Sequence, residues 1–189
     1  CGDVWTDSVR LNQAVLASRR ERFDEALELL GQVVDVQLRF HATEHRINIL
    51  RRLDRTDEAA AMAEAVLEEE HGKEGDGESL ARTAAMLGRI HLDQGRDRTR
   101  LRERLLKWID QYRRDCSPLM AVLRDVDGLW SDRARSFKLT VNVTFPEDHL
   151  LRAESAGFYV VCDVVADDCD EALYFVRRLE DDDFGETFE

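Results

Sequence analysis

The sequence predicts a mainly α-helical protein, in which an array of helical hairpins over residues 1–135 precedes a small α+β domain over residues 136–189. Three observations predict this. No proline precedes Pro118, and alanine, leucine, arginine and glutamate dominate the first part of the chain, which favours helices. Apolar residues recur there at helical spacing, in segments separated by short polar breaks. After residue 135 the pattern changes to the alternation of apolar and polar residues that is typical of a strand.

Composition and charge exclude several classes of function. With 189 residues, 43% of them apolar, the chain can bury a substantial core. Its 27 lysine and arginine residues stand against 40 acidic residues, and the net charge of −13 opposes binding to nucleic acid or to an anionic membrane. No apolar run approaches the roughly 20 residues that a membrane span needs. We therefore expect neither nucleic-acid binding nor a membrane span.

The cysteines indicate a reducing compartment. The four cysteines include no Cys-x-x-Cys pair and do not form the dense framework of small secreted domains, so a cytoplasmic location is expected. The chain begins with Cys1, as a mature bacterial lipoprotein would, but a helical pattern starts within a few residues and leaves no flexible tether. A fragment of a longer protein is the expected origin.

Three helical hairpins are expected in succession. In each hairpin, two segments with helical periodicity flank a short polar break. The breaks are SRRERF at 18–23, Asp54 to Thr56, and Gln94-Gly95. Each hairpin is therefore two helices joined by a tight turn.

The second helices of the three hairpins begin alike. Setting them in register makes Ala26, Ala59 and Arg100 equivalent, and these residues are 33 and 41 positions apart (59 − 26 and 100 − 59). The additional length of the second interval falls in HGKEGDGES, residues 71–79, whose glycines and charges predict a surface loop. The aligned segments are RFDEAL (22–27), RTDEAA (55–60) and RDRTRL (96–101).

With this register the chain resembles the tetratricopeptide repeat family, whose unit is a helix-turn-helix of about 34 residues. The resemblance covers roughly residues 5–114 and is best in ASRRERFDEALELLGQVV (17–34) and AAMLGRIHLDQG (84–95). Ile47 stands where the family has a small residue, and Arg100 replaces the packing alanine, so we expect an irregular second helix in the third hairpin. An unrelated helical bundle is the alternative interpretation.

A seventh helix is expected to cover the open end of the array. In SPLMAVLRDVDGLW, residues 117–130, Ser117 is the predicted N-cap and Pro118 the first helical residue. Its apolar positions would pack on the last hairpin, because a repeat stack otherwise leaves its terminal apolar side in water. These positions are Leu119, Val122, Leu123, Val126 and Trp130.

The C-terminal segment predicts the order strand, strand, helix. FKLTVNVTF (137–145) alternates apolar and polar residues, whereas GFYVVCDVVA (157–166) is apolar on both faces except for Asp163. A helix with one apolar stripe follows from Cys169 to Glu180, after a capping aspartate. That helix can cover one face of the ribbon. The seventh helix would cover the other and bury Val161, or the strands would pair with a second chain as a homodimer.

HATEH, residues 41–45, has the His-x-x-Glu-His spacing of one group of zinc peptidases. Such a site needs a third ligand, a glutamate far downstream. About 75 residues further on the chain offers Asp125 and Asp127 but no glutamate. We therefore interpret His41, Glu44 and His45 as structural or groove-lining residues and expect no metal.

Other catalytic patterns are absent from the sequence. It contains no phosphate-binding glycine loop, nucleophile elbow or dinucleotide fingerprint, so we expect neither an enzyme nor a cofactor. His91 lies in a helix with an apolar pattern and is interpreted as a packed histidine rather than a base.

The resemblance implies that the first helices of the hairpins line a concave groove. The register projects nine residues onto it: Ser8, Leu11, Val15, His41, Asn48, Arg51, Arg52, Arg82 and Arg89. The last six are the predicted partner-binding residues. Because all of them except Asn48 are histidine or arginine in an acidic chain, an acidic protein or peptide is the expected partner, unless the arginines only solvate the helices.

The sequence thus predicts a protein-interaction or assembly scaffold. The alternative is a regulatory region, or less readily a catalytic one resembling the zinc peptidases, within a larger enzyme or effector complex.

Overall fold

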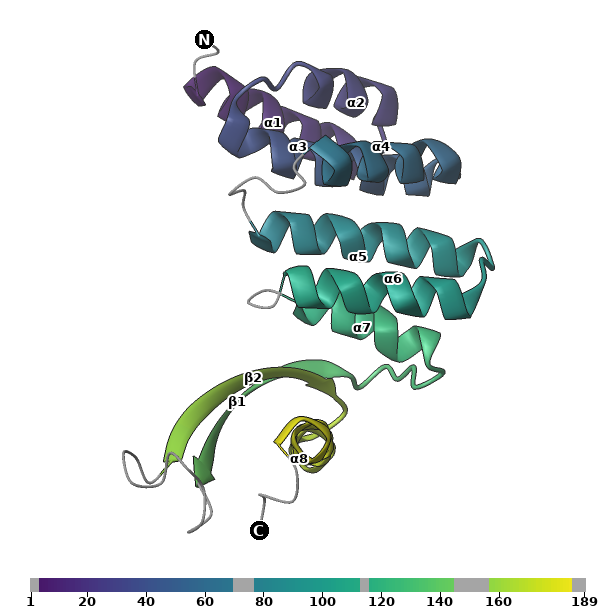
Figure 1. Cartoon of the computed structure of the whole chain (residues 1–189). Coiled ribbons are helices and arrows are strands. Elements are labelled where there is room, and N and C mark those ends of the chain that lie inside the picture. The colour runs from purple at the N-terminus through teal and green to yellow at the C-terminus, as the bar shows by residue number, and fades with distance from the viewer. Residues whose placement is uncertain (1–3, 70–76, 113–115, 145–156, 185–189) are drawn as a thin grey trace. The chain divides into compact units, whose positions relative to one another are not determined.

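The computed structural model describes residues 4–69, 77–112, 116–144 and 157–184. These residues are mainly helical and include a two-stranded antiparallel sheet (Figure 1). The chain divides into two compact units, Cys1–Asp115 and Cys116–Glu189. Among the described helices, none combines the length and the apolar character that a membrane crossing requires.

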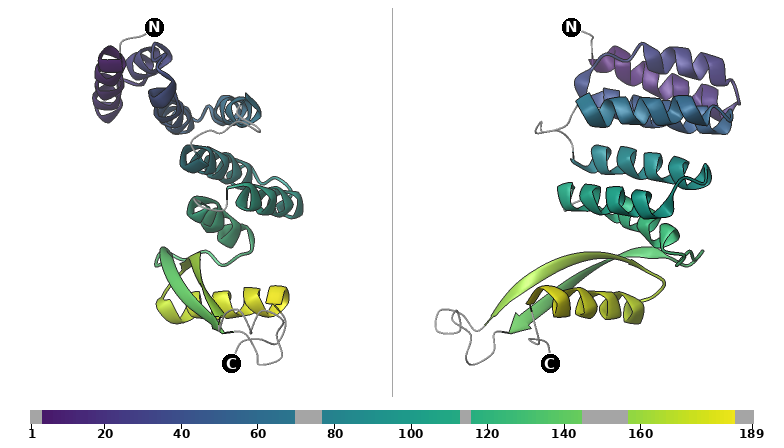
Figure 2. Two further views of the ribbon diagram at one scale, coloured as in Figure 1. Left: turned by 60° about the vertical axis from the view of Figure 1, so that its left-hand side comes forward. Right: turned by 45° about the vertical axis from the view of Figure 1, so that its right-hand side comes forward.

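The described part of the first unit contains six helices in three hairpins, which can be followed in Figure 2. The helix boundaries fall at the polar breaks that the sequence predicts. The helices are α1 (Val4–Arg19), α2 (Phe23–Gly31), α3 (Val36–Arg52), α4 (Thr56–Glu69), α5 (Gly77–Asp93) and α6 (Arg98–Gln111).

All three hairpin turns are built on the same backbone motif. Glu21, Asp54 and Gly95 adopt the left-handed conformation, with φ angles of 60°, 59° and 68°. The N–H of the next residue donates to the carbonyl five positions earlier, which closes a Schellman motif at the end of each first helix. These bonds run from Arg22 to Ala17, from Arg55 to Leu50 and from Arg96 to His91, at 2.9, 2.9 and 3.0 Å. The turns therefore repeat at the intervals that the sequence predicts.

The second helix of the third hairpin is regular, so the irregular helix predicted from Arg100 is wrong. In the first two hairpins the N–H groups of Ala26 and Ala59 open the helix by donating four residues back, and in the third the N–H of Leu101 does so. Leu101 is buried and Arg100 is exposed. The third turn is thus one residue longer, and Leu101 takes the packing position.

The core of the first unit lies between consecutive helices. Each helix packs on the next one in sequence, and α1 also contacts α3 while α3 contacts α5. Ala14, Ile47 and Gly88, at equivalent positions of the three first helices, are all buried. One apolar cluster contains Ala14, Ala17, Ala26, Leu30, Val33, Ala42 and Ile49.

The second unit has the predicted order of two strands and a helix. It contains α7 (Ser117–Val126), β1 (Arg135–Thr144), β2 (Gly157–Ala166) and α8 (Cys169–Phe184). β1 pairs antiparallel with β2, and the strands form a curved ribbon with α8 on its concave side (Figure 1). Val164 and Ala166 of β2 are buried against Ala172 and Val176 of α8. One face of the ribbon is therefore covered by α8, as predicted.

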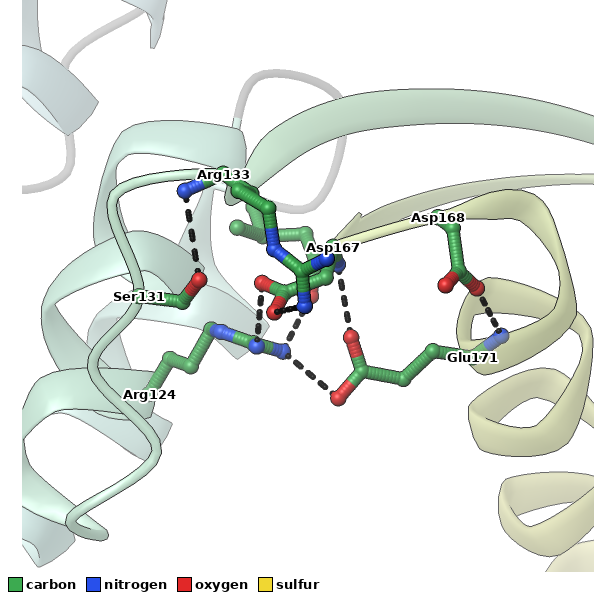
Figure 3. A network of polar contacts seen from close by, with 7 residues as sticks. Arg124, Ser131, Arg133, Asp167, Asp168 and Glu171 are labelled. Carbon is green, nitrogen blue, oxygen red and sulfur yellow. Dashed lines mark hydrogen bonds and ion pairs between the residues drawn. The ribbon is translucent and has the colours of Figure 1, made fainter.

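Arg124 ties α7 to the turn between β2 and α8 (Figure 3). Its buried guanidinium lies 2.8 Å from Asp167 Oδ1 and 3.2 Å from Glu171 Oε1, and it donates to the carbonyl of Val165 at 3.4 Å. Arg133 also reaches Asp167, at 3.3 Å. These contacts place residues 116–135 with the C-terminal strands, whereas the sequence suggested a division after residue 135.

Two local predictions in this unit are wrong. Ser117 is the first helical residue of α7 rather than its N-cap, and Cys116 takes the cap position without a side-chain hydrogen bond. Val161 is 59% exposed, although we expected the seventh helix to bury it. α7 does contact β2, where Val165 is buried, but Val161 and Tyr159 on the same face of the strand remain exposed. Pairing with a second chain stays a prediction.

Candidate functional site

The first helices of the three hairpins form one continuous face, because α3 contacts both α1 and α5. We call this the α1–α3–α5 face. None of the six predicted partner-binding residues is buried. His41, Asn48 and Arg52 on α3 are exposed, whereas Arg51 on α3 and Arg82 and Arg89 on α5 are half-buried. Two of the other projected positions, Ser8 and Val15, are half-buried on α1, while Leu11 packs against the apolar core.

Arg82 on α5 is engaged with the neighbouring hairpin. Its Nε lies 2.8 Å from Glu44 Oε1 on α3, and its Nη1 pairs with Glu78 on α5 at 2.5 Å. Its guanidinium also donates to Ser79 Oγ at 3.3 Å. A guanidinium that already binds two carboxylates has little capacity left for a third, so Arg82 holds hairpins together more than it attracts an acidic partner.

Arg51 and Arg52 at the end of α3 differ in their contacts. Arg51 Nη2 lies 3.1 Å from Asp93 Oδ2 on α5, which makes a second ion pair between hairpins. The guanidinium of Arg52 stacks over the ring of Phe23, with 4.7 Å from Cζ to the ring centroid. Arg52 is exposed and has no carboxylate partner within the described residues. Of the two, Arg52 is the one whose charge is available to a ligand.

The HATEH residues all lie on α3. His41 Nδ1 is 4.0 Å from Glu44 Oε2, and the other oxygen of Glu44 accepts the hydrogen bond from Arg82. Partial desolvation on α3 lowers the pKa of His45, although its side chain is exposed; the Glu44 carboxylate partly opposes this effect and His41 reinforces it. No group of three metal-binding side chains occurs in the parts of the chain that the structure describes. Glu44 is thus paired with Arg82 and is not a free carboxylate that could act as a general base.

Asp7 makes a buried structural contact that sequence reasoning missed. It is fully buried in the first turn of α1, and its Oδ2 accepts the N–H groups of Val34 and Asp35 at 2.9 and 2.8 Å. Arg10 Nη1 donates to Oδ1 at 2.7 Å. The hydrogen bond from Asp35 is the largest cause that holds the pKa of Asp7 below its ordinary value; burial acts the other way, and the bonds from Val34 and Arg10 lower it further. No local pattern in the sequence marks this contact, because the partners lie 27 and 28 residues away.

A cavity of about 410 Å³ lies between α5 and α6, and sequence reasoning also missed it. Its lining is basic, and its deepest polar group is His91, which is 5% exposed. The lining residues are His91, Arg96, Asp97, Arg100, Leu101 and Arg104. No signal in the sequence marks it, because the repeat register assigns Arg100 to a packing position, and only the structure shows the one-residue shift that leaves Arg100 exposed at the cavity.

Comparison with known proteins yields no match, whether to a protein-family model, to a curated protein or to a solved structure.

Proposed function

We propose that the first unit is a tetratricopeptide-like array and that the chain is a scaffold, which binds a partner protein or peptide on the α1–α3–α5 face. The observation that supports this best is the repetition of one Schellman turn at Glu21, Asp54 and Gly95, together with the contacts of α3 to α1 and α5. Repeated hairpins whose first helices adjoin produce an extended surface, and such surfaces serve as binding sites in repeat proteins.

Fewer residues of this face can attract an acidic partner than the six predicted ones. Arg51 and Arg82 are neutralised by carboxylates of the array itself. Arg52 keeps an available guanidinium, which the ring of Phe23 holds in place. We therefore expect Arg52, with Asn48 one turn earlier on α3, to make the contacts that matter most.

The experiment places a photoreactive benzoylphenylalanine at Asn48, and at Ala65 as the control. Both residues are exposed, Asn48 on α3 and Ala65 on α4. In an extract of the source cells, irradiation should give a specific adduct from the Asn48 variant and none from the Ala65 variant. Adding Arg52→Glu should weaken the adduct at least about fivefold, because a charge-assisted contact contributes about 1–3 kcal/mol.

The same adduct from both positions, or an adduct that survives Arg52→Glu unchanged, would show that the partner binds elsewhere. Circular dichroism of each variant checks that the helices are intact.

A further inference from the structure

The cavity between α5 and α6 holds positive charge that the described residues of the first unit compensate only in part. Arg104 Nη1 is paired with Glu64 Oε1 of α4 at 3.3 Å, and its guanidinium stacks on Trp108 at 4.6 Å. Within the described residues, the guanidinium of Arg96 donates only to the neutral amide oxygen of Gln94, at 3.2 Å. The guanidinium of Arg100 has no partner among the described residues; only its backbone N–H is bonded, to Asp97 Oδ1 at 3.1 Å. Two of the three arginines therefore lack a counter-charge of their own.

Asp97, the carboxylate that lines the cavity, is engaged at the start of α6. Its Oδ1 is the N-cap acceptor of that helix, and a carboxylate in this position is held by the backbone N–H and the helix dipole. The cavity lining therefore carries an excess of positive charge in a chain whose net charge is −13. An anion is the ligand class that this excess favours.

His91 is a second, independent sign of a ligand. Its side chain is almost fully buried, and its Nε2 has no hydrogen-bond partner within the described residues. The nearest carboxylate oxygen, Glu64 Oε1, is 3.9 Å away, which is too far for a hydrogen bond. A buried polar atom without a partner destabilises the fold, and an oxyanion in the cavity would accept its N–H.

We propose that this cavity binds a tetrahedral dianion of the phosphate or sulfate class, with Arg100 and Arg96 as its cationic contacts and His91 Nε2 as a buried donor. Guanidinium forks match the spacing of oxygens on such an anion. A volume of about 410 Å³ lies within the range of about 300–1,000 Å³ that is typical of small-molecule sites. The cavity thus has room for the organic part of a phosphorylated small molecule as well as for the anion.

This site is independent of the proposed scaffold function. Arg82 and Arg89 are seven residues apart and lie on one side of α5, whereas His91 follows Arg89 by two residues, about 200° around the helix. Loss of anion binding would leave the α1–α3–α5 face unaffected, and the photocrosslinking experiment above does not depend on the cavity.

The pH dependence follows from the charges that face His91. Burial lowers the pKa of His91, and Arg96 and Arg104 lower it further, while Glu64 of α4 opposes them. The imidazole is therefore neutral at pH 7 and can carry its proton on Nε2. Since a bound dianion favours the charged imidazolium, sulfate affinity should rise as the pH falls from 8 to 6. Sulfate is the suitable probe, because it keeps its charge over this range.

The test is calorimetric titration of the full chain with sodium sulfate, with sodium chloride at equal ionic strength as the reference. Saturable sulfate binding is expected, with a Kd on the order of 0.1–1 mM, as the affinity limit for a five-atom ligand allows. Arg100→Gln should weaken it at least about tenfold. Arg98→Gln is the matched control, since Arg98 is exposed two residues earlier on α6 and does not line the cavity. It should change the Kd less than about twofold.

The His91 Nε2 resonance in a ¹⁵N-labelled sample should shift on addition of sulfate in the wild-type chain and not in Arg100→Gln. Inorganic phosphate and glycerol 2-phosphate then distinguish the free ion from a phosphorylated small molecule: the ester binds at least threefold more tightly if the ligand is the latter. The proposal is overturned if sulfate behaves like chloride, if both arginine variants lose binding equally, or if malonate, a dianion of planar carboxylates, binds as tightly as sulfate.

Discussion

At the scale of single residues, Asp7 joins α1 to the segment that precedes α3. Two backbone N–H groups and Arg10 satisfy its buried carboxylate, and these bonds keep its pKa below 3.8, the value of a free aspartate. A lowered pKa stabilises the fold above the unfolded-state pKa, and the stabilisation is lost as the pH falls through the folded-state pKa. The contribution of Asp7 should therefore be complete above about pH 5 and decline below about pH 4.

Asp7→Asn should lower the unfolding temperature at pH 7, and the difference from wild type should narrow as the pH is reduced below 4. Asp24→Asn, a change at an exposed aspartate of α2, is the control and should have little effect at either pH. Thermal unfolding followed by circular dichroism at several pH values measures both. A difference that stays constant with pH would contradict the role given to the Asp7 charge.

The HATEH residues lead to a second prediction at this scale. Because Glu44 is paired with Arg82, and the chain lacks the downstream glutamate, the purified protein should contain no stoichiometric zinc and show no peptidase activity. Elemental analysis after dialysis checks the first statement. About one zinc per chain, lost in His41→Ala, would restore the peptidase interpretation.

At the scale of elements, the three hairpin turns allow a graded test. Glu21 and Asp54 occupy left-handed positions that favour glycine, and Gly95 already supplies one. Glu21→Gly should raise the free energy of unfolding by about 0.5–1 kcal/mol, and Asp54→Gly by less, because aspartate tolerates this conformation better than glutamate does. Gly95→Ala should lower it by about 1 kcal/mol through backbone strain alone, since a Cβ there meets no atom within 4 Å. Urea unfolding measures all three, and equal effects at the three turns would disprove the ranking.

The two faces of β2 give another contrast. Val161 is 59% exposed and Val164 is 6% exposed, so Val161→Lys should change the free energy of unfolding by less than about 0.5 kcal/mol, whereas Val164→Lys should cost several times more. Light scattering of the wild type and of Val161→Lys also tests the predicted strand-mediated homodimer, which the lysine would convert into a folded monomer. A large loss of stability in monomeric Val161→Lys would show that this face is covered.

The boundaries of helices and strands were predictable where a short stretch of sequence determines them. Polar breaks and alternating strands are readable in one segment of sequence, and the boundaries of the hairpins and of β2 were predicted closely for that reason. The one-residue shift that gives Leu101 the place expected for Arg100 changes no periodicity, so the sequence does not reveal it. The partners of Arg51 and Arg82 are 42 and 38 residues away, and only the packing of α3 against α5 selects them.

At the scale of the whole chain, each unit has an apolar core of its own. Leu30 belongs to the cluster of the first unit and Val176 to that of the second. Leu30→Ala should destabilise the first unit by about 2–5 kcal/mol, and amide exchange should accelerate in α1 to α4 while the protection of β1 and β2 is retained. Val176→Ala should produce the converse pattern. Uniform acceleration in both units by either variant would mean that the chain unfolds as one cooperative body.

The common turn has a consequence for how such a chain can change in length. A hairpin that carries this turn between its two helices, and whose main contacts are with the adjoining hairpins, can be copied or removed without altering the turns of the others. The change in chain length that the array tolerates best is then the insertion or deletion of a whole hairpin, not of a single residue. An engineered chain with α3 and α4 duplicated should fold and gain helical circular dichroism in proportion to the added residues. Insertion of one residue within α3 should instead rotate the rest of that helix by about 100° and disrupt its contacts with α1, α4 and α5.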